Sequence, residues 1–297
     1  MSLVLSSNQI ATRNLGSYKS LVSNATDELA AYKARVLADG GTVIDEAATK
    51  AAIQKLIDKG VYGLAKVYVG GSFGVKKDGS GNLIKLYSID GLDMTLFSIG
   101  VGKPVNHIAG EIVFTNDIKS STTQTDGTVF TTELTQAPKG RGLVYGISGS
   151  SIKNAGSAEA GVSGFTLLDK QTNSSPLWFV TIPTGGGTVN CFKQTGIPDQ
   201  NSTANTTRVQ ANVSTTGTRY SFFSDYINNQ LKGYRDGGQV TAASASSAIA
   251  DLTGFNGYIT LGGYIKKTTV TESFLSNIKV KEFFVFDDLP ESRLYLA

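Results

Sequence analysis

The spacing of the apolar residues switches from helical to strand-like at Gly60, and that change limits the folds that the chain can adopt. Between Thr26 and Gly60, apolar residues recur every three or four positions, which is the spacing of one face of an α-helix. After Gly60 they alternate with polar residues in short runs, as in β-strands, and Gly, Asn and Asp separate the runs. No long helical pattern interrupts the series, so the sequence predicts an antiparallel β-sandwich rather than a fold of alternating strands and helices.

The predicted strands occupy most of the chain after this change. They are residues 65–69, 83–89, 111–115, 142–147, 177–182, 220–227, 230–235, 258–261 and 278–286. In the hairpin of residues 220–240, Asn228-Asn229 either forms a two-residue turn or belongs to a longer loop, and the two alternatives have equal weight. The polar stretch 174–218, after a strand centred on Trp178, is predicted to contain a long surface loop.

Two amphipathic helices are predicted in the first part of the chain. The first has its N-cap at Thr26 and ends at Asp39-Gly40-Gly41, and the second follows Asp45 and ends at Lys59-Gly60. Their apolar faces consist of Leu29, Tyr32, Val36 and Leu37 in the first helix and of Ala52, Ile53, Leu56 and Ile57 in the second. A helical hairpin of about 35 residues is too small to be stable alone, so its apolar face is expected to pack on the β domain or on another copy of the chain.

Residues 1–22 show neither helical nor strand spacing, which predicts an extended arm. Such an arm is disordered in most free proteins and can become ordered against a neighbouring subunit. The predicted organisation is therefore an N-terminal arm (1–22), a helical hairpin (23–62) and a β-sandwich domain (63–297).

The charge of the chain argues against nucleic acid as a partner. The 27 basic and 24 acidic residues are scattered and give a net charge of +3, without a basic stripe that could neutralise several phosphates. The single cysteine, Cys191, excludes an intramolecular disulfide and is expected to be a buried core residue. No segment resembles a signal peptide or reaches the length of a membrane span, so we expect neither export by a leader nor insertion in a membrane.

The chain lacks the residues that most catalytic sites require. A zinc site or a Ser-His-Asp triad would have to be built around one histidine, His107, and one cysteine. Retaining glycosidases need two carboxylates about 5 Å apart, often from one face of a strand. The acidic groups closest to that arrangement are Asp90 with Asp93, and Glu282 with Asp287 and Asp288, and neither alternates correctly. We therefore expect that the protein is not an enzyme.

Two kinds of ligand site remain as weak candidates. Asp225, Asp236 and Asp251 lie in or near turns and could supply oxygens to calcium, although solvated turn residues explain them better. Aromatic residues of the β region could stack against a sugar, although each fits a core or sheet position better. The glycan candidates are Trp178, Tyr234 and Tyr264, with Tyr220 and Tyr226 as further aromatic residues of the same region.

The C-terminal part contains an ordered set of short motifs. They are Gly233-Tyr234-Arg235-Asp236-Gly237-Gly238, then Tyr258-Ile259-Thr260-Leu261-Gly262-Gly263, then Phe274 to Phe286, then Asp287-Asp288-Leu289-Pro290-Glu291-Ser292. Over residues 205–297 this order resembles concanavalin A-like (laminin G-type) modules, which implies a jelly-roll β-sandwich. In the last strand, Ile278, Val280, Phe284 and Phe286 are predicted to face the core, opposite Lys279 and Lys281. Phe283 and Val285 break this alternation, which indicates that the end of the strand is covered on both sides.

The first part of the chain resembles tail and capsid-associated proteins of bacteriophages over residues 27–90. The segments that carry the resemblance are Ala34 to Val43 and Lys85-Leu86-Tyr87-Ser88. It implies a structural component of the virion, on the capsid surface or the tail, assembled in the bacterial host cytoplasm. Other virion proteins, and further copies of the same chain, are the implied partners. A glycan-binding adhesin for host polysaccharide is the alternative, and a glycoside hydrolase is the third possibility.

Overall fold

The computed structural model describes residues 22–116, 126–133, 135–136, 143–150, 160–167, 178–183, 187–194, 208–225, 227–245, 256–265, 273–287 and 289. The predicted arm lies outside these ranges except for Val22. All strand pairs in the described part of the chain are antiparallel.

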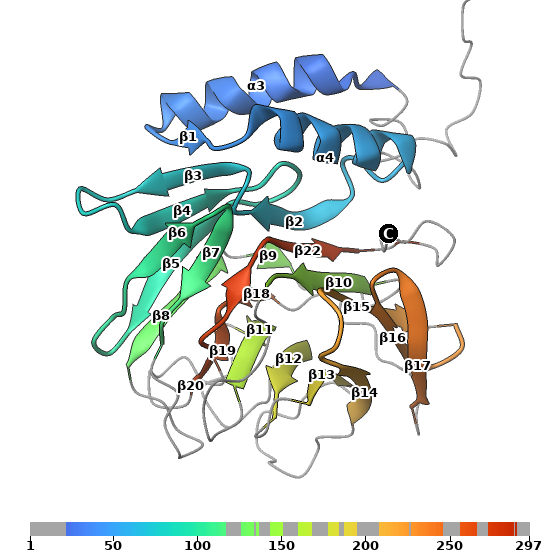
Figure 1. Ribbon diagram of the computed structural model, residues 1–297. Helices are drawn as coiled ribbons and strands as arrows, with labels where there is room; N and C mark the ends of the chain where they lie inside the picture. Colours follow the sequence, from blue (N-terminus) through green and yellow to red (C-terminus); the bar gives the residue numbers. More distant parts are fainter. Residues whose placement is uncertain are drawn as a thin grey trace, which may run out of the picture.

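The described helices and strands follow one another in the order drawn in Figure 1. They are α3 (Ala25–Ala38), β1 (Thr42–Val43), α4 (Glu46–Asp58), β2 (Ala65–Gly70), β3 (Gly74–Lys77), β4 (Leu83–Tyr87), β5 (Met94–Ile99), β6 (Val105–Ile108), β7 (Glu111–Phe114), β8 (Gly127–Thr132), β9 (Thr135–Gln136), β10 (Leu143–Ser148), β11 (Ala160–Leu167), β12 (Trp178–Ile182), β13 (Thr188–Gln194), β14 (Arg208–Ser214), β15 (Arg219–Asp225), β16 (Gln230–Arg235), β17 (Gly238–Ser244), β18 (Asn256–Leu261), β19 (Gly263–Ile265), β20 (Ser273–Leu275), β21 (Lys279–Val280) and β22 (Glu282–Phe286).

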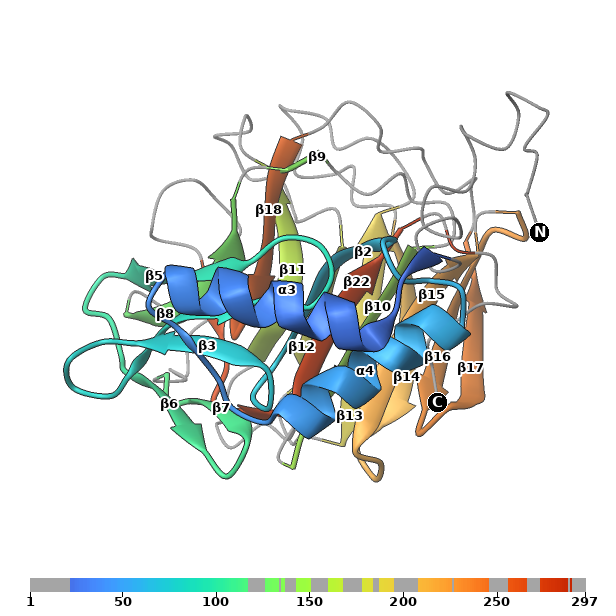
Figure 2. The same cartoon turned by 90° about the horizontal axis from the view of Figure 1, so that it is seen from above.

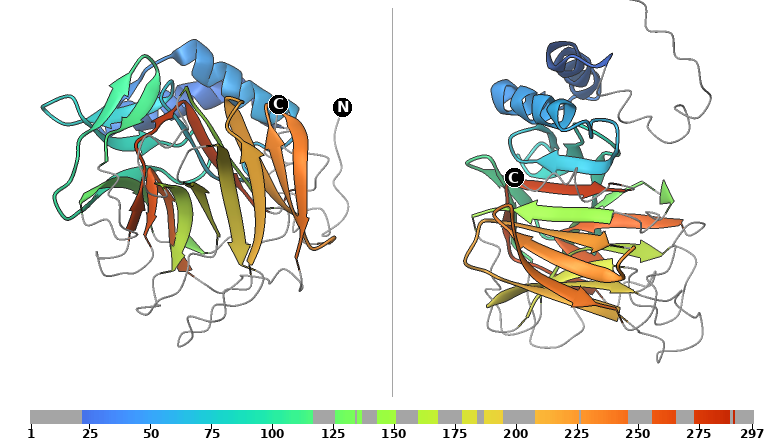
Figure 3. Two further views of the ribbon diagram at one scale, coloured as in Figure 1. Left: turned by 60° about the horizontal axis from the view of Figure 1, so that its bottom comes forward. Right: turned by 90° about the vertical axis from the view of Figure 1, so that its right-hand side faces the viewer.

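Two large sheets form the body of the protein. An eleven-stranded sheet has the order β1-β3-β4-β5-β8-β18-β11-β12-β13-β14, with β9 paired to β18, and a six-stranded sheet has the order β17-β16-β15-β10-β22-β2. Their facing side chains share one core, in which Val162, Val180 and Ile259 of the larger sheet meet Tyr145 and Phe222 of the smaller one. The predicted antiparallel β-sandwich is confirmed, and its layers are visible in Figure 3.

Both predicted helices are present, with two corrections to the first. Asn24, not Thr26, is the N-cap of α3, because its side chain accepts a hydrogen bond from the Thr26 N–H. Leu37, predicted for the apolar face, is 61% exposed, whereas Tyr32 and Val36 are buried. Asp45 caps α4 as predicted and accepts from the Ala48 N–H.

Helix α4 packs on the outer face of the six-stranded sheet, and α3 lies beside α4, as seen from above in Figure 2. The Tyr32 hydroxyl of α3 donates to Tyr87 O of β4 and accepts from the Gly74 N–H of β3, so α3 covers the end of the larger sheet. Ile53 and Leu56 of α4 are fully buried in a second core together with Tyr68, Phe284 and Phe286 of the sheet. Of the two predicted packing partners, the β domain is therefore the one used by the helical hairpin. The six-stranded sheet is buried on both faces where the helices cover it.

The last predicted strand, 278–286, is two strands, and its face assignment was partly wrong. The backbone bends at Lys281, whose N–H donates to Ser148 O and whose carbonyl accepts from the Gly71 N–H. This irregularity shifts the alternation by one residue. As a result Val280, Phe283 and Val285 face the sandwich core, while Phe284 and Phe286 face the helices. The expectation that this strand end is covered on both sides is confirmed.

The stretch 174–218 contains more strand than was predicted, because β13 and β14 form a hairpin within it. Val189, Cys191 and Val213 alternate with polar residues and are fully buried, a pattern hidden by the high polar content of this stretch.

In the hairpin of β15 and β16 the last residue pair before the turn is Asp225 with Gln230. Of the two predicted alternatives, the longer loop is therefore present and the two-residue Asn228-Asn229 turn is not.

Candidate functional site

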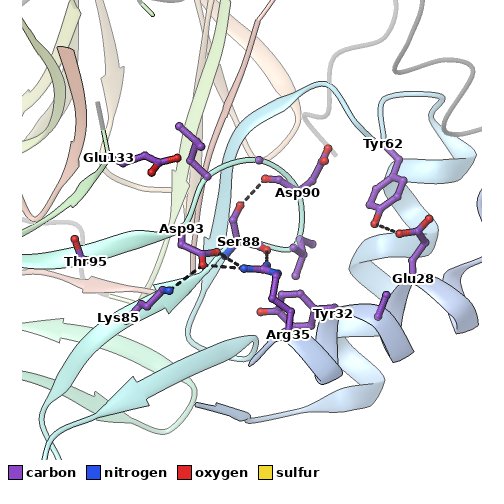
Figure 4. Close-up of a pocket in the computed structure, with 14 residues that line it drawn as sticks. Glu28, Tyr32, Arg35, Tyr62, Lys85, Ser88, Asp90, Asp93, Thr95 and Glu133 are labelled. Carbon is purple, nitrogen blue, oxygen red and sulfur yellow. Dashed lines mark hydrogen bonds and ion pairs between the residues drawn. The ribbon is translucent and has the colours of Figure 1, made fainter. Parts of the chain in front are cut away.

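A pocket of about 580 Å³ opens between α3 and the loop that connects β4 to β5. Its walls come from α3, the start of the segment after α4, strands β4 and β5, and the residue after β8 (Figure 4). The lining residues are Glu28, Ala31, Tyr32, Arg35, Tyr62, Lys85, Ser88, Ile89, Asp90, Gly91, Leu92, Asp93, Thr95 and Glu133. Four of them are carboxylates and two are cations, so charged groups line the pocket alongside apolar surface.

The loop of residues 88–93 is held against the edge of strand β2. The Ile89 N–H donates to Tyr68 O at 2.9 Å, and the Leu92 N–H donates to Lys66 O at 2.8 Å. Gly91 has φ of +90°, and a Cβ there would lie 2.4 Å from Lys66 O, so this position requires glycine. The pocket floor is therefore fixed by backbone contacts, and the edge of β2 is covered.

Asp93 and Arg35 form the central ion pair of the pocket. Arg35 Nη1 lies 2.8 Å from each carboxylate oxygen of Asp93, and Arg35 Nη2 donates to Ser88 O at 2.7 Å. Lys85 Nζ lies 3.2 Å from Asp93 Oδ2, and the Ser88 N–H donates to Asp93 Oδ1 at 2.9 Å. These contacts join α3 to the β4–β5 loop and use both oxygens of Asp93.

Two other carboxylates of the pocket, those of Asp90 and Glu28, also accept hydrogen bonds. Asp90 Oδ2 accepts from the N–H groups of Gly63 and Ala65, at 2.7 and 3.2 Å. Glu28 Oε2 accepts from the Tyr62 hydroxyl at 2.7 Å. Burial, together with the nearby Glu28 carboxylate, raises the pKa of Tyr62 well above its usual value, so its hydroxyl stays protonated as a donor.

The outer wall of the pocket is less constrained. Thr95 and Glu133 are exposed, and their side chains make no hydrogen bond to another residue in the described part of the chain. Tyr32 and Tyr62 are 5% and 3% exposed, so their rings offer little surface for stacking. The pocket is suited to a polar ligand that hydrogen-bonds to charged side chains, and less to one that stacks on an aromatic ring.

The predicted calcium ligands are not gathered in one place. Asp225 is buried and accepts from the N–H and Nδ2 of Asn228, and Lys232 Nζ lies 3.0 Å from it. Burial raises the pKa of Asp225, but the bonds from Asn228 and Lys232 outweigh this effect and lower it. Asp236 lies at the other end of the same hairpin, and Asp251 lies outside the described residues. Among the described residues no three His, Cys, Asp or Glu side chains are grouped for a metal ion.

The aromatic residues predicted for a glycan site lie in several elements. Tyr234 is buried in the second core and Tyr220 is buried with its hydroxyl donating to Gly217 O. Trp178 lies in β12 and Tyr264 in β19, and the side chains of both, like the whole of Tyr226, lie outside the described part of the structure.

The acidic pair Asp90 and Asp93, singled out in the sequence, does line the pocket. The second acidic group is dispersed, since Glu282 lies 3.8 Å from Arg219, Asp287 is buried, and Asp288 lies outside the described residues. Sequence reasoning missed Arg35, which is 58 positions from Asp93 and carries no motif. In the described part of the chain no helix is long and apolar enough to cross a membrane.

No family model and no curated protein matches this chain. Among solved structures, the binding domain of botulinum neurotoxin DC in complex with SialylT is similar at 10% identity and a TM-score of 0.45, over 77% of this chain and 50% of that one. The binding domain of botulinum neurotoxin serotype G gives 12% identity and a TM-score of 0.46, over 77% and 49%. The CBM40 of the Ruminococcus gnavus IT-sialidase, bound to α2,3-sialyllactose, gives 16% identity and a TM-score of 0.37, over 51% and 79%. This chain spans about half the length of the neurotoxin domains, and similarity at this level carries no function across.

Proposed function

We propose that the protein is a non-catalytic structural component of a bacteriophage particle, which attaches through its N-terminal part and displays its β-sandwich outward. The observation that carries the proposal is the position of residues 27–90, the part that resembles phage tail and capsid-associated proteins. These residues make up α3, α4 and strands β1 to β4, which lie together at one side of the molecule (Figure 1). Strands β1, β3 and β4 belong to the larger sheet and β2 to the smaller one, so the proposed attachment part forms one end of the sandwich, from which the rest would be displayed.

The absence of catalysis is part of the same proposal. A glycosidase needs one carboxylate that can hold a proton and a second that remains free to attack. In the pocket Asp93 is paired with Arg35 and Lys85, and Asp90 accepts from two backbone N–H groups. Both carboxylates therefore serve to hold the loop of residues 88–93 in place, which disfavours their use as the acid and the nucleophile of a glycosidase.

Mass spectrometry of phage particles purified on a density gradient tests the proposal, using a lysate that produces this chain. We expect the chain to remain with the particles through repeated banding, in a fixed ratio to the major capsid protein. Recovery of the chain only from the soluble fraction, with particles that lack it, would show that it is not a virion component.

Glycan binding is the second candidate function, and the pocket favours it. Charged side chains and hydroxyl groups line a volume of about 580 Å³, large enough for a small polar ligand. Thr95 is exposed on its wall, so Thr95→Trp should obstruct the pocket without disturbing the bonds of Arg35 and Asp93. A particle protein can also bind host sugars, so the two candidate functions are compatible.

The test is an array of bacterial surface polysaccharides probed with the purified chain. We expect binding that falls at least tenfold in Thr95→Trp and is retained in Thr42→Trp, the matched control at an exposed threonine of β1. Absence of binding by the wild-type chain, or an equal loss in both variants, would remove the pocket as a glycan site.

A further inference from the structure

The charges that line the pocket between α3 and the β4–β5 loop do not balance. The lining residues include two cations and four carboxylates, which gives them a net charge of −2. The cations are Arg35 and Lys85, and the carboxylates are Glu28, Asp90, Asp93 and Glu133. Because the attraction between charges grows where protein replaces water, such a lining favours a ligand of the opposite charge.

Both cations of the pocket already contact aspartates. Arg35 Nη1 lies 2.8 Å from each carboxylate oxygen of Asp93. Lys85 Nζ lies 3.2 Å from Asp93 Oδ2 and 2.9 Å from Asp39 Oδ2. The hydrogen bond from Lys85 holds the pKa of Asp39 well below its usual range, so Asp39 stays ionised beside this lysine. An acidic ligand would have to compete with these aspartates for the two cations, which disfavours ligands of that class.

Glu133 is the carboxylate at the outer wall of the pocket. It directly follows β8 and Asp93 directly precedes β5, and the pair of Met94 with Thr132 joins the two strands there (Figure 4). The Glu133 side chain is exposed, and within the described ranges it makes no hydrogen bond or ion pair. Thr95 is exposed on the same wall. A ligand therefore meets a carboxylate and a hydroxyl where it enters the pocket.

We propose that the pocket selects sugars with a free, positively charged amino group over N-acetylated and acidic sugars, and that Glu133 binds the ammonium group. An ammonium group has three donors and no acceptor, so it suits a lining in which carboxylates outnumber cations. Acetylation of the amine removes the charge and with it the attraction to the lining. This inference rests on the pocket being a glycan site, the second candidate function given above.

Isothermal titration calorimetry of the whole chain at pH 6 tests the selectivity with three probes. They are a disaccharide of glucosamine, its N-acetylated form and a disaccharide that contains glucuronic acid. The first two differ only in the acetyl groups, so their comparison isolates the charge of the amine. We expect the free amine to bind at least tenfold more tightly than the acetylated form, and the acidic sugar to bind no better than the acetylated one.

Two Glu→Gln variants test the role of Glu133. Glu133→Gln removes one negative charge from the outer wall at nearly constant size, and the preference for the free amine should fall at least threefold. Glu46→Gln removes the same charge at an exposed position of α4 that does not line the pocket, so the preference should stay at its wild-type value. A preference that is equal in the wild type and Glu133→Gln would contradict the role of Glu133.

The titrations also separate this inference from the glycan site itself. Equal binding of the free and acetylated sugars, or tighter binding of the acidic one, would overturn the selectivity and leave the pocket as a glycan site. Binding of none of the three sugars, together with no binding on the polysaccharide array, would remove both the site and its selectivity.

Discussion

At the residue scale, the turn between β16 and β17 shows how a short motif determines local structure. Arg235 pairs with Gly238, so Asp236 and Gly237 alone make the turn, with φ of +49° and +89°. Two consecutive residues with positive φ are what a type I′ turn requires, and Asp-Gly is a favoured pair for it. Asp236 Oδ1 also accepts from the N–H groups of Thr218 and Arg219, both at 3.0 Å, and so joins the turn to the start of β15.

The charge of Asp236 should contribute to stability in a pH-dependent way. The backbone N–H of Thr218 is the largest of the contacts that lower the pKa of Asp236. A carboxyl with a lowered folded-state pKa stabilises the fold above the unfolded-state value, near 4, and loses this contribution as the pH falls through the folded-state value. Asp236→Asn keeps the turn geometry, so it should cost about 0.5–1 kcal/mol at pH 7, because solvent screens this exposed carboxylate, and less at pH 3. Urea unfolding at both pH values measures this, and a difference that stays constant down to pH 2 would contradict it.

Residue-scale prediction from the sequence succeeded where the determining contacts are local. Asp45 as the cap of α4 and Gly60 at its end, with φ of +66°, are examples. It failed for Arg35, because the carboxylate that Arg35 binds follows it by 58 positions and only the fold brings the two together. The pocket could therefore not be predicted, although Asp90 and Asp93 are visible in the sequence as an acidic pair.

At the element scale, the helical hairpin is an integral layer of the domain. Helix α4 buries Ile53 and Leu56 against Phe284 and Phe286. Arg35 joins helix α3 to the loop of residues 88–93, which covers the edge of β2. The spacing of apolar residues predicted both helices, since that spacing depends only on nearby residues. It did not predict the bend at Lys281, because the bend depends on backbone bonds to Ser148 and Gly71.

Two Leu→Ala variants test the helical layer. Leu56→Ala removes a fully buried side chain and should destabilise the protein by about 2–5 kcal/mol. Leu37→Ala, at a position 61% exposed, should change stability by less than about 0.5 kcal/mol. Chemical denaturation followed by far-ultraviolet and near-ultraviolet circular dichroism measures both. In Leu56→Ala the far-ultraviolet and near-ultraviolet signals should change at the same denaturant concentration. If the helices unfolded at a lower concentration than the sandwich, the helical layer would be a separate folding unit.

At the scale of the whole molecule, the sandwich was predictable because period-two alternation survives in strands with one face buried. The order of the strands was not, since neighbours such as β8 and β18 are far apart in sequence and no local pattern specifies their pairing. The polar strands β13 and β14 were missed for a related reason, because their alternation is carried by small residues such as Cys191 and Ala211. Fold class thus follows from local periodicity, and topology follows from contacts that the sequence does not display.

The position of the chain on a particle tests the central proposal most directly. A cryo-electron microscopy reconstruction of purified particles, compared with particles that lack the chain, would give difference density for it. We predict that α3 and α4 lie next to the capsid or tail surface. The end of the eleven-stranded sheet that contains β13 and β14 should point away from that surface. Difference density with the sandwich against the particle and the helices outward, or no difference density, would contradict the proposal.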